Sequence, residues 1–295
     1  TQQTSSERWF MSPVWLALAV SVIWGIEPLF FRSALAEFTP ESVVWLRFAG
    51  ALPCFLIFAK TRETLSRSAL IGGVFLAMNY LGFLKGIELA GPAGATVLLQ
   101  SGSFIFVGIS VLTGESRLSG TQRLALLITI AGYVCYFSDI ARSASVNSQT
   151  LTGYAWVLLS AMSWAVYATL TRRAAASASP HWLTAQSFFI ALLVLSCVST
   201  PFEFRMATLQ KMALLAVIVC LTIVAYSCLG LALRRGKAAV VAPIIATNPL
   251  ITLLALTLEA QFASGAGVSP PLTVWGTIGV LLVVAGVGLV SRNKW

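Results

Sequence analysis

Residues 24–40 read WGIEPLFFRSALAEFTP, and residues 164–180 read WAVYATLTRRAAASASP. The second stretch lies 140 residues after the first, and three residues match without a gap: Trp24 with Trp164, Arg32 with Arg172, and Pro40 with Pro180. A shift of 144 residues aligns a second set, Ala95 with Ala239 and Glu115 with Glu259, and each glutamate ends an apolar stretch. These matches occupy equivalent places in the two halves of the chain, so the sequence predicts an internal repeat.

The composition around these stretches is that of a membrane protein. Of the 295 residues, 58% are hydrophobic and only 10% are charged, whereas a soluble domain has about 25% charged residues. The chain therefore carries more apolar surface than a soluble core could bury, and lipid must solvate much of it.

Ten apolar stretches are long enough to cross a bilayer, which takes about 20 residues in a helix. They cover approximately 13–34, 41–59, 68–89, 92–114, 120–138, 152–171, 181–200, 208–232, 238–258 and 273–291. The predicted fold is an all-α integral membrane protein with ten transmembrane helices. Residues 1–138 form the first five-helix repeat, residues 139–151 form an inter-repeat loop, and residues 152–295 form the second repeat.

Lys and Arg are unevenly divided between alternate loops. Of the 19 such residues, thirteen fall on the side of the N-terminus, five fall on the opposite side, and Arg47 lies inside a span. Because cytoplasmic loops are enriched in positive charge, this bias predicts that both termini are cytoplasmic. Five spans is an odd number, so the second repeat must be inverted relative to the first. Inverted repeats are a hallmark of secondary transporters.

Several other classes of function are disfavoured by the sequence. It contains no nucleotide-binding loop of the G-x-x-x-x-G-K-[ST] type, and His181 is the only histidine, so we expect no enzyme, no cofactor and no metal site. The basic residues are scattered over many loops, which argues against nucleic acid as a partner. The expected partners are the lipid bilayer and a small-molecule substrate. The sequence does not determine the oligomeric state, for which we expect a monomer.

Glu27 is the most informative polar residue, because it lies in the middle of the first span, next to Pro28. A carboxylate at this depth is costly unless it is paired, protonated or facing water. It could line a cavity and bind an ammonium group or a proton. Alternatively, it could form a structural pair with Arg47 of the second span. The sequence leaves both interpretations open.

Other polar and aromatic residues fall in the middles of equivalent spans, where a central cavity would lie. The candidate substrate-binding residues, besides Glu27, are Trp24, Asn79, Tyr80, Phe83, Gln100, Ser101, Trp164, Tyr167, Tyr226 and Asn248. Pro28 and Pro249 are candidate hinges for gating, because proline frees a carbonyl group and lets a helix kink. The alternative for the polar residues is a structural role in bonding neighbouring helices.

With ten spans in two halves, the pair Trp24-Gly25 and the glutamates Glu115 and Glu259, the chain resembles the drug/metabolite transporter superfamily. It is most similar to the EamA-type branch and, within it, to the YddG group of bacterial aromatic amino acid exporters. Pro249 matches the proline of the ninth helix in this family, whereas Ile105 departs from the pattern in the fourth.

The resemblance implies export of amino acids, aromatic ones among them, and of some toxic small molecules across the bacterial inner membrane. We predict that the protein exports aromatic and other neutral amino acids by alternating access at a central cavity. An exporter of lipophilic cations and drugs is the alternative within the same class. A channel or a membrane interaction protein without transport is the alternative from another class.

Overall fold

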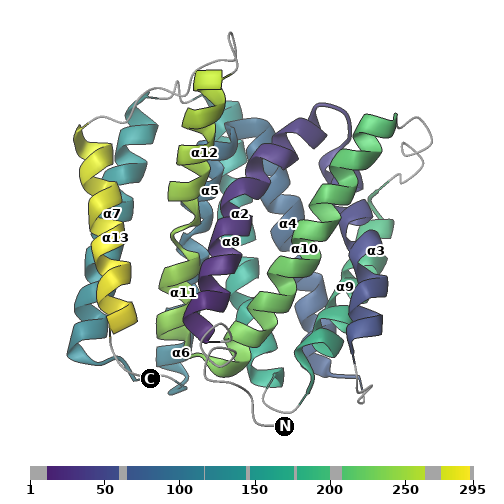
Figure 1. The fold of residues 1–295 in the computed structure, drawn as a ribbon, viewed down its shortest axis with the longest axis horizontal. Coiled ribbons are helices and arrows are strands. Elements are labelled where there is room, and N and C mark those ends of the chain that lie inside the picture. Colours follow the sequence, from purple (N-terminus) through teal and green to yellow (C-terminus); the bar gives the residue numbers. More distant parts are fainter. Residues whose placement is uncertain are drawn as a thin grey trace.

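The computed structural model describes residues 12–59, 65–115, 117–143, 147–175, 178–199, 208–262 and 274–292. Every regular element in these ranges is a helix, and the helices stand side by side as a bundle (Figure 1). Their bounds are α2 Pro13–Leu35, α3 Pro40–Phe58, α4 Arg67–Ala90, α5 Pro92–Leu99, α6 Ser101–Leu112, α7 Gly120–Ser143, α8 Ser148–Ala174, α9 Pro180–Ser196, α10 Leu209–Arg235, α11 Ala238–Ile245, α12 Asn248–Phe262 and α13 Val274–Arg292.

The described residues form ten helical rods, the number expected from the sequence, if α5–α6 and α11–α12 each count as one rod. Seven of these rods are long and apolar enough to cross a membrane, and α9 and part of α13 are shorter apolar helices. The chain is therefore a helical membrane protein. In Figure 1, α2 begins and α13 ends at the same end of the bundle. The termini themselves, residues 1–11 and 293–295, lie outside the described residues.

Two features differ from the expected spans. The predicted single helices 92–114 and 238–258 are each broken, at Gln100 and at Ala246–Thr247. In addition, helices occupy much of the interval 139–151, because α7 continues to Ser143 and α8 begins at Ser148. These helices are longer than the apolar stretches that predicted them, because polar residues extend them by a turn or more.

The repeated proline of the two halves has a structural counterpart at the start of a helix. Pro40 opens α3 after Thr39, and Pro180 opens α9 after Ser179. Proline is favoured at the first helical position, because its missing N–H would have no partner there and its fixed φ suits the helix. The match in sequence therefore marks the same helix boundary in both halves.

The broken rods expose carbonyl groups that side-chain hydroxyls satisfy. At the first break, Ser101 Oγ donates to the Leu98 carbonyl over 2.8 Å. At the second, Thr247 Oγ1 donates to the Ile244 carbonyl over 2.7 Å and lies 2.8 Å from Ser21 Oγ. Interrupted helices are tolerated at membrane depth where nearby groups satisfy the freed backbone. Hydroxyl side chains therefore make both breaks compatible with a bilayer.

The helices of the first half (α2–α7) pack against those of the second half (α8–α13) in a reciprocal pattern. Helix α4 packs along α8, and its counterpart α10 packs along α2. Helix α3 packs on α9. Helix α7 packs on α13, and these two helices stand together at one side of the bundle (Figure 1). Helices α5 and α6 contact α8, whereas α11 and α12 contact α2. Exchanging the two halves leaves this pattern unchanged, as in an interface that uses the same patch twice.

Glycines let the broken rods approach the other half closely. A Cβ atom added at Gly25 of α2 would lie 2.9 Å from the Asn248 carbonyl oxygen, and one added at Gly102 of α6 would lie 2.6 Å from that of Ala161 in α8. Small residues at such crossings allow the backbones of membrane helices to come together. Both glycines lie in the first half, and each lets a broken rod of one half approach a helix of the other.

We expect Gly102→Ala to destabilise the protein by about 1–3 kcal/mol, the usual cost of overpacking. The added methyl group meets backbone in α8, which cannot turn aside as a flexible side chain can. Gly108→Ala, in the same helix, is the matched control, since a Cβ there meets nothing within 4 Å. The free energy of unfolding of both variants can be measured in mild detergent. Equal stability of the two would show that the close approach at Gly102 is unimportant.

Candidate functional site

A narrow cavity lies between the halves, where the two broken rods meet α2, α4 and α8. Its volume is about 40 Å³, which is enough for a few water molecules. Ligand pockets for small molecules are usually about 300–1,000 Å³, so the cavity must widen to admit one. The lining residues are Trp24, Glu27, Asn79, Tyr80, Phe83, Thr96, Leu99, Gln100, Ser103, Trp164, Ile245 and Asn248.

The structure brings most of the predicted substrate-binding residues to this cavity. Tyr167 and Tyr226 do not line it, but they pack behind it. Ser101 lies elsewhere, in a separate cavity of about 250 Å³ between α5–α6 and α7. Thr96, Leu99, Ser103 and Ile245 line the central cavity although they were not among the candidates. They lie within four residues of the helix breaks, which the hydropathy pattern did not reveal.

Glu27 and Arg47 form a fully buried ion pair. Arg47 Nη2 lies 2.9 Å from Glu27 Oε1 and 3.2 Å from Oε2, and the two side chains are 0% and 3% exposed. The guanidinium also lies over the ring of Tyr80, 4.1 Å from its centroid, where a cation–π attraction stabilises it. The pairing interpretation of Glu27 is therefore correct. Glu27 lines the cavity as well, and it is the only charged residue among the described residues that do so.

Aromatic rings form one wall of the site. Trp24 and Trp164, the repeat-related tryptophans, meet edge to face with their ring centroids 6.3 Å apart. Tyr226 packs against Trp24 with centroids 6.1 Å apart, and its hydroxyl donates to that of Tyr80 over 3.0 Å. Tyr167 packs on Tyr226 at 6.3 Å. The predicted aromatic residues thus form a cluster that joins both halves.

Amide side chains that line the cavity join helices of the two halves. Gln100 Nε2 donates to Asn248 Oδ1 over 2.7 Å, which connects the break before α6 to the start of α12. Asn79 Nδ2 donates to Ser160 Oγ over 2.9 Å, and Ser160 Oγ donates to the Asn79 carbonyl over 2.6 Å. These bonds join the halves, as expected for interhelical polar contacts. Asn79 therefore has a structural role in addition to its place at the cavity.

The two candidate hinge prolines occupy different positions. Pro28 lies inside α2, one residue after Glu27. Pro249 lies at the start of α12, directly after the break at Ala246–Thr247. Pro249 therefore accompanies a break between two helices and not a kink within one continuous helix. Ile105, the equivalent residue in the first half, lies within α6 and away from the break at Gln100.

Ion pairs join the halves at both ends of the bundle. At one end, Arg32 of α2 contacts Glu259 of α12, with Nη2 to Oε1 and Oε2 distances of 2.5 and 2.6 Å. At the other end, Arg173 of α8 donates from Nε to Glu115 Oε1 over 2.6 Å. Arg172 lies 3.6 Å from Glu115 Oε2. Figure 1 places the ends of α6 and α12 at opposite ends of the bundle.

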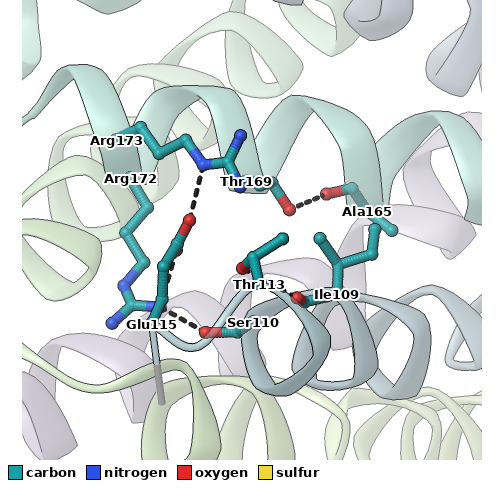
Figure 2. Close-up of polar contacts among 8 residues, drawn as sticks. All are labelled: Ile109, Ser110, Thr113, Glu115, Ala165, Thr169, Arg172 and Arg173. Atoms are coloured by element: carbon teal, nitrogen blue, oxygen red, sulfur yellow. Dashed lines mark hydrogen bonds and ion pairs between the residues drawn. The ribbon is translucent and has the colours of Figure 1, made fainter.

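The second of these ion pairs has more contacts than the first. Figure 2 shows both arginines reaching from α8 to Glu115, which follows α6, while Arg172 Nη1 also donates to Ser110 Oγ over 2.7 Å. Each contact joins the first helix of one half to the glutamate near the end of the fourth rod of the other, Arg32 to Glu259, and Arg172 and Arg173 to Glu115. We call them the Glu259 pair and the Glu115 pair.

This fold and this site define a polytopic membrane protein with a cavity of mixed polar and apolar lining between its two halves. Within the described ranges, no group of His, Cys, Asp and Glu residues could hold a metal ion. The sequence matches the model of the EamA-like transporter family twice, over residues 11–138 and 151–292. The chain belongs to this family of membrane transporters.

Two relatives from Escherichia coli strain K12 are similar along most of their length. An uncharacterized inner membrane transporter, YhbE, is 27% identical, with 92% of this chain and 88% of the relative covered. A probable amino-acid metabolite efflux pump is also 27% identical, with 82% and 85% covered. A solved crystal structure shares the fold with a TM-score of 0.73 at 17% identity, over 95% of this chain and 98% of its own.

Proposed function

We propose that this protein exports amino acids, aromatic and other neutral ones among them, across the bacterial inner membrane by alternating access. The observation that carries the proposal is the cavity between the halves, where aromatic rings and amide groups surround one neutralised carboxylate. The relatives named an amino-acid metabolite efflux pump and an inner membrane transporter support the substrate class and the membrane. We also propose that, within its family, this protein is most similar to the YddG group of exporters.

Alternating access is supported by the reciprocal packing of the halves and by the two matches to one family model. In our proposal the halves are inverted repeats, and both termini lie in the cytoplasm. The Glu259 pair and the Glu115 pair are then the same contact made twice, once on each side of the membrane. Opening one side breaks one pair while the other holds. In the present structure both pairs are formed and the cavity is narrow, which corresponds to the state between the two openings.

The charge of the site favours neutral amino acids over lipophilic cations. A cation needs an unpaired negative charge at membrane depth, whereas Glu27 already pairs with Arg47 at 2.9 Å. Adding a cation would leave one uncompensated charge in a region where charges are costly. A zwitterion adds none. Some toxic small molecules without net charge would fit the same site.

Transport by protein in liposomes tests the proposal. We expect saturable counterflow of a neutral amino acid from a panel that includes L-phenylalanine, and little transport of a quaternary amine. Empty liposomes are the control. Conductance without saturation would indicate a channel instead, and efficient quaternary amine transport would indicate a cation exporter. Binding without any flux would contradict transport altogether.

A further inference from the structure

The indole nitrogens of Trp24 and Trp164 have no hydrogen-bond acceptor from the described part of the protein. Both atoms are buried, and both belong to side chains that line the cavity. Trp164 as a whole is only 6% exposed. Almost all buried donors in proteins have a partner, so two without a protein acceptor at one site require an explanation.

The two donors are related by the internal repeat. Their rings meet edge to face with centroids 6.3 Å apart. One ring comes from α2 of the first half and the other from α8 of the second. Indole N–H only donates and does not accept. A ligand that satisfies both must therefore bring acceptor atoms to the boundary between the halves. A carboxylate has two oxygens with about four acceptor sites.

The remaining polar groups at the cavity suit the other end of an amino acid. Arg47 Nη2 contacts both oxygens of Glu27, which leaves part of the acceptor capacity of this carboxylate for an ammonium group. Two of the amide groups at the cavity already donate to the protein, Gln100 Nε2 to Asn248 Oδ1 and Asn79 Nδ2 to Ser160 Oγ. Among the described side chains that line the cavity, the two indoles carry the fully buried donors that have no protein acceptor.

We propose that the paired indole N–H groups of Trp24 and Trp164 bind the carboxylate of a zwitterionic α-amino acid, while Glu27 receives its ammonium group. This proposal rests on the proposed function and names the chemistry by which the same cavity selects its substrate. It makes both tryptophans hydrogen-bonding residues as well as aromatic walls. Since each half supplies one N–H, the carboxylate is held across the boundary that moves during transport.

Phenylalanine substitutions test the proposal, because they remove the N–H and keep an aromatic ring. The ligands are the best-transported amino acid of the panel and its amide, which lacks the carboxylate. Trp24→Phe and Trp164→Phe are each expected to raise the inhibition constant of the amino acid about 10- to 100-fold, the value of a hydrogen bond to a charged group. The inhibition constant of the amide is expected to change by less than about twofold. An amide that does not inhibit the wild type also supports a carboxylate requirement.

Trp45→Phe is the matched control, because Trp45 Nε1 already donates to Ser196 Oγ over 2.9 Å and Trp45 is not among the residues that line the cavity. It is expected to leave both inhibition constants unchanged. Equal weakening of the amino acid and its amide in the cavity variants would overturn the proposal, as would unchanged affinity for the amino acid. Failure of the proposed function is distinguishable, since it would appear in the wild type as absence of amino acid transport.

Discussion

Replacing Arg47 with leucine is expected to destabilise the protein by about 3–5 kcal/mol, the cost of leaving a buried charge without its partner. Glu27 would keep its negative charge at a site where its side chain is 3% exposed, or would have to take up a proton. The substitution also removes the cation that lies over the ring of Tyr80. Unfolding in detergent, followed by circular dichroism, measures the effect.

The double variant Glu27→Met/Arg47→Met is the control for this result. Replacing a buried ion pair by apolar residues of similar volume is often close to neutral, so we expect it to be more stable than the single variant. Transport by the double variant should be lost, because the cavity would have no carboxylate left. A single variant as stable as the wild type would show that the pair contributes nothing to the fold.

A cross-link between residues 32 and 259 is expected to reduce transport to the level of empty liposomes. Arg32→Cys and Glu259→Cys would be introduced into a chain whose five native cysteines, all free thiols, are replaced by serine. A reversible bifunctional thiol reagent would then replace the ion pair by a covalent bond. If this end of the bundle must open in every cycle, no substrate can pass until a reductant releases the link.

Glu41→Cys/Lys85→Cys provides the matched control, because the Lys85–Glu41 pair has a similar N to O distance of 2.9 Å but joins α3 and α4 of the same half. The same reagent is expected to leave transport there unchanged. Full transport by the protein linked between residues 32 and 259 would contradict the gating role of the Glu259 pair.

Much of the fold could be predicted from composition and from the repeat, because lipid forces each apolar stretch of about 20 residues into a helix. The helix breaks at Gln100 and at Ala246–Thr247 could not. Their stability depends on hydroxyl groups from other positions, such as Ser21 beside Thr247. A hydropathy pattern read along the chain contains no such contact. Pro249 pointed to the second break, but the first has no proline.

The sequence predicted how deep in the membrane the site residues lie, but not the direction in which their side chains point. Position along a span told which residues lie near the middle of the membrane, and most of the candidates do line the cavity. Adjacent residues of a helix point about 100° apart, however, so Gln100 and Ser101 face different cavities. The sequence likewise placed Glu27 and Arg47 at similar depth, but only the packing of α2 on its neighbours decides that they meet.

The buried ion pair of Glu27 and Arg47 has a consequence for energy coupling. Moving one elementary charge across a membrane potential of 100 mV involves about 2.3 kcal/mol of electrical work. Two opposite charges 2.9 Å apart travel together, so their displacements in the field cancel. In a carrier of the kind that we propose, with an electroneutral cargo, the membrane potential therefore does no net electrical work on the pair and the cargo.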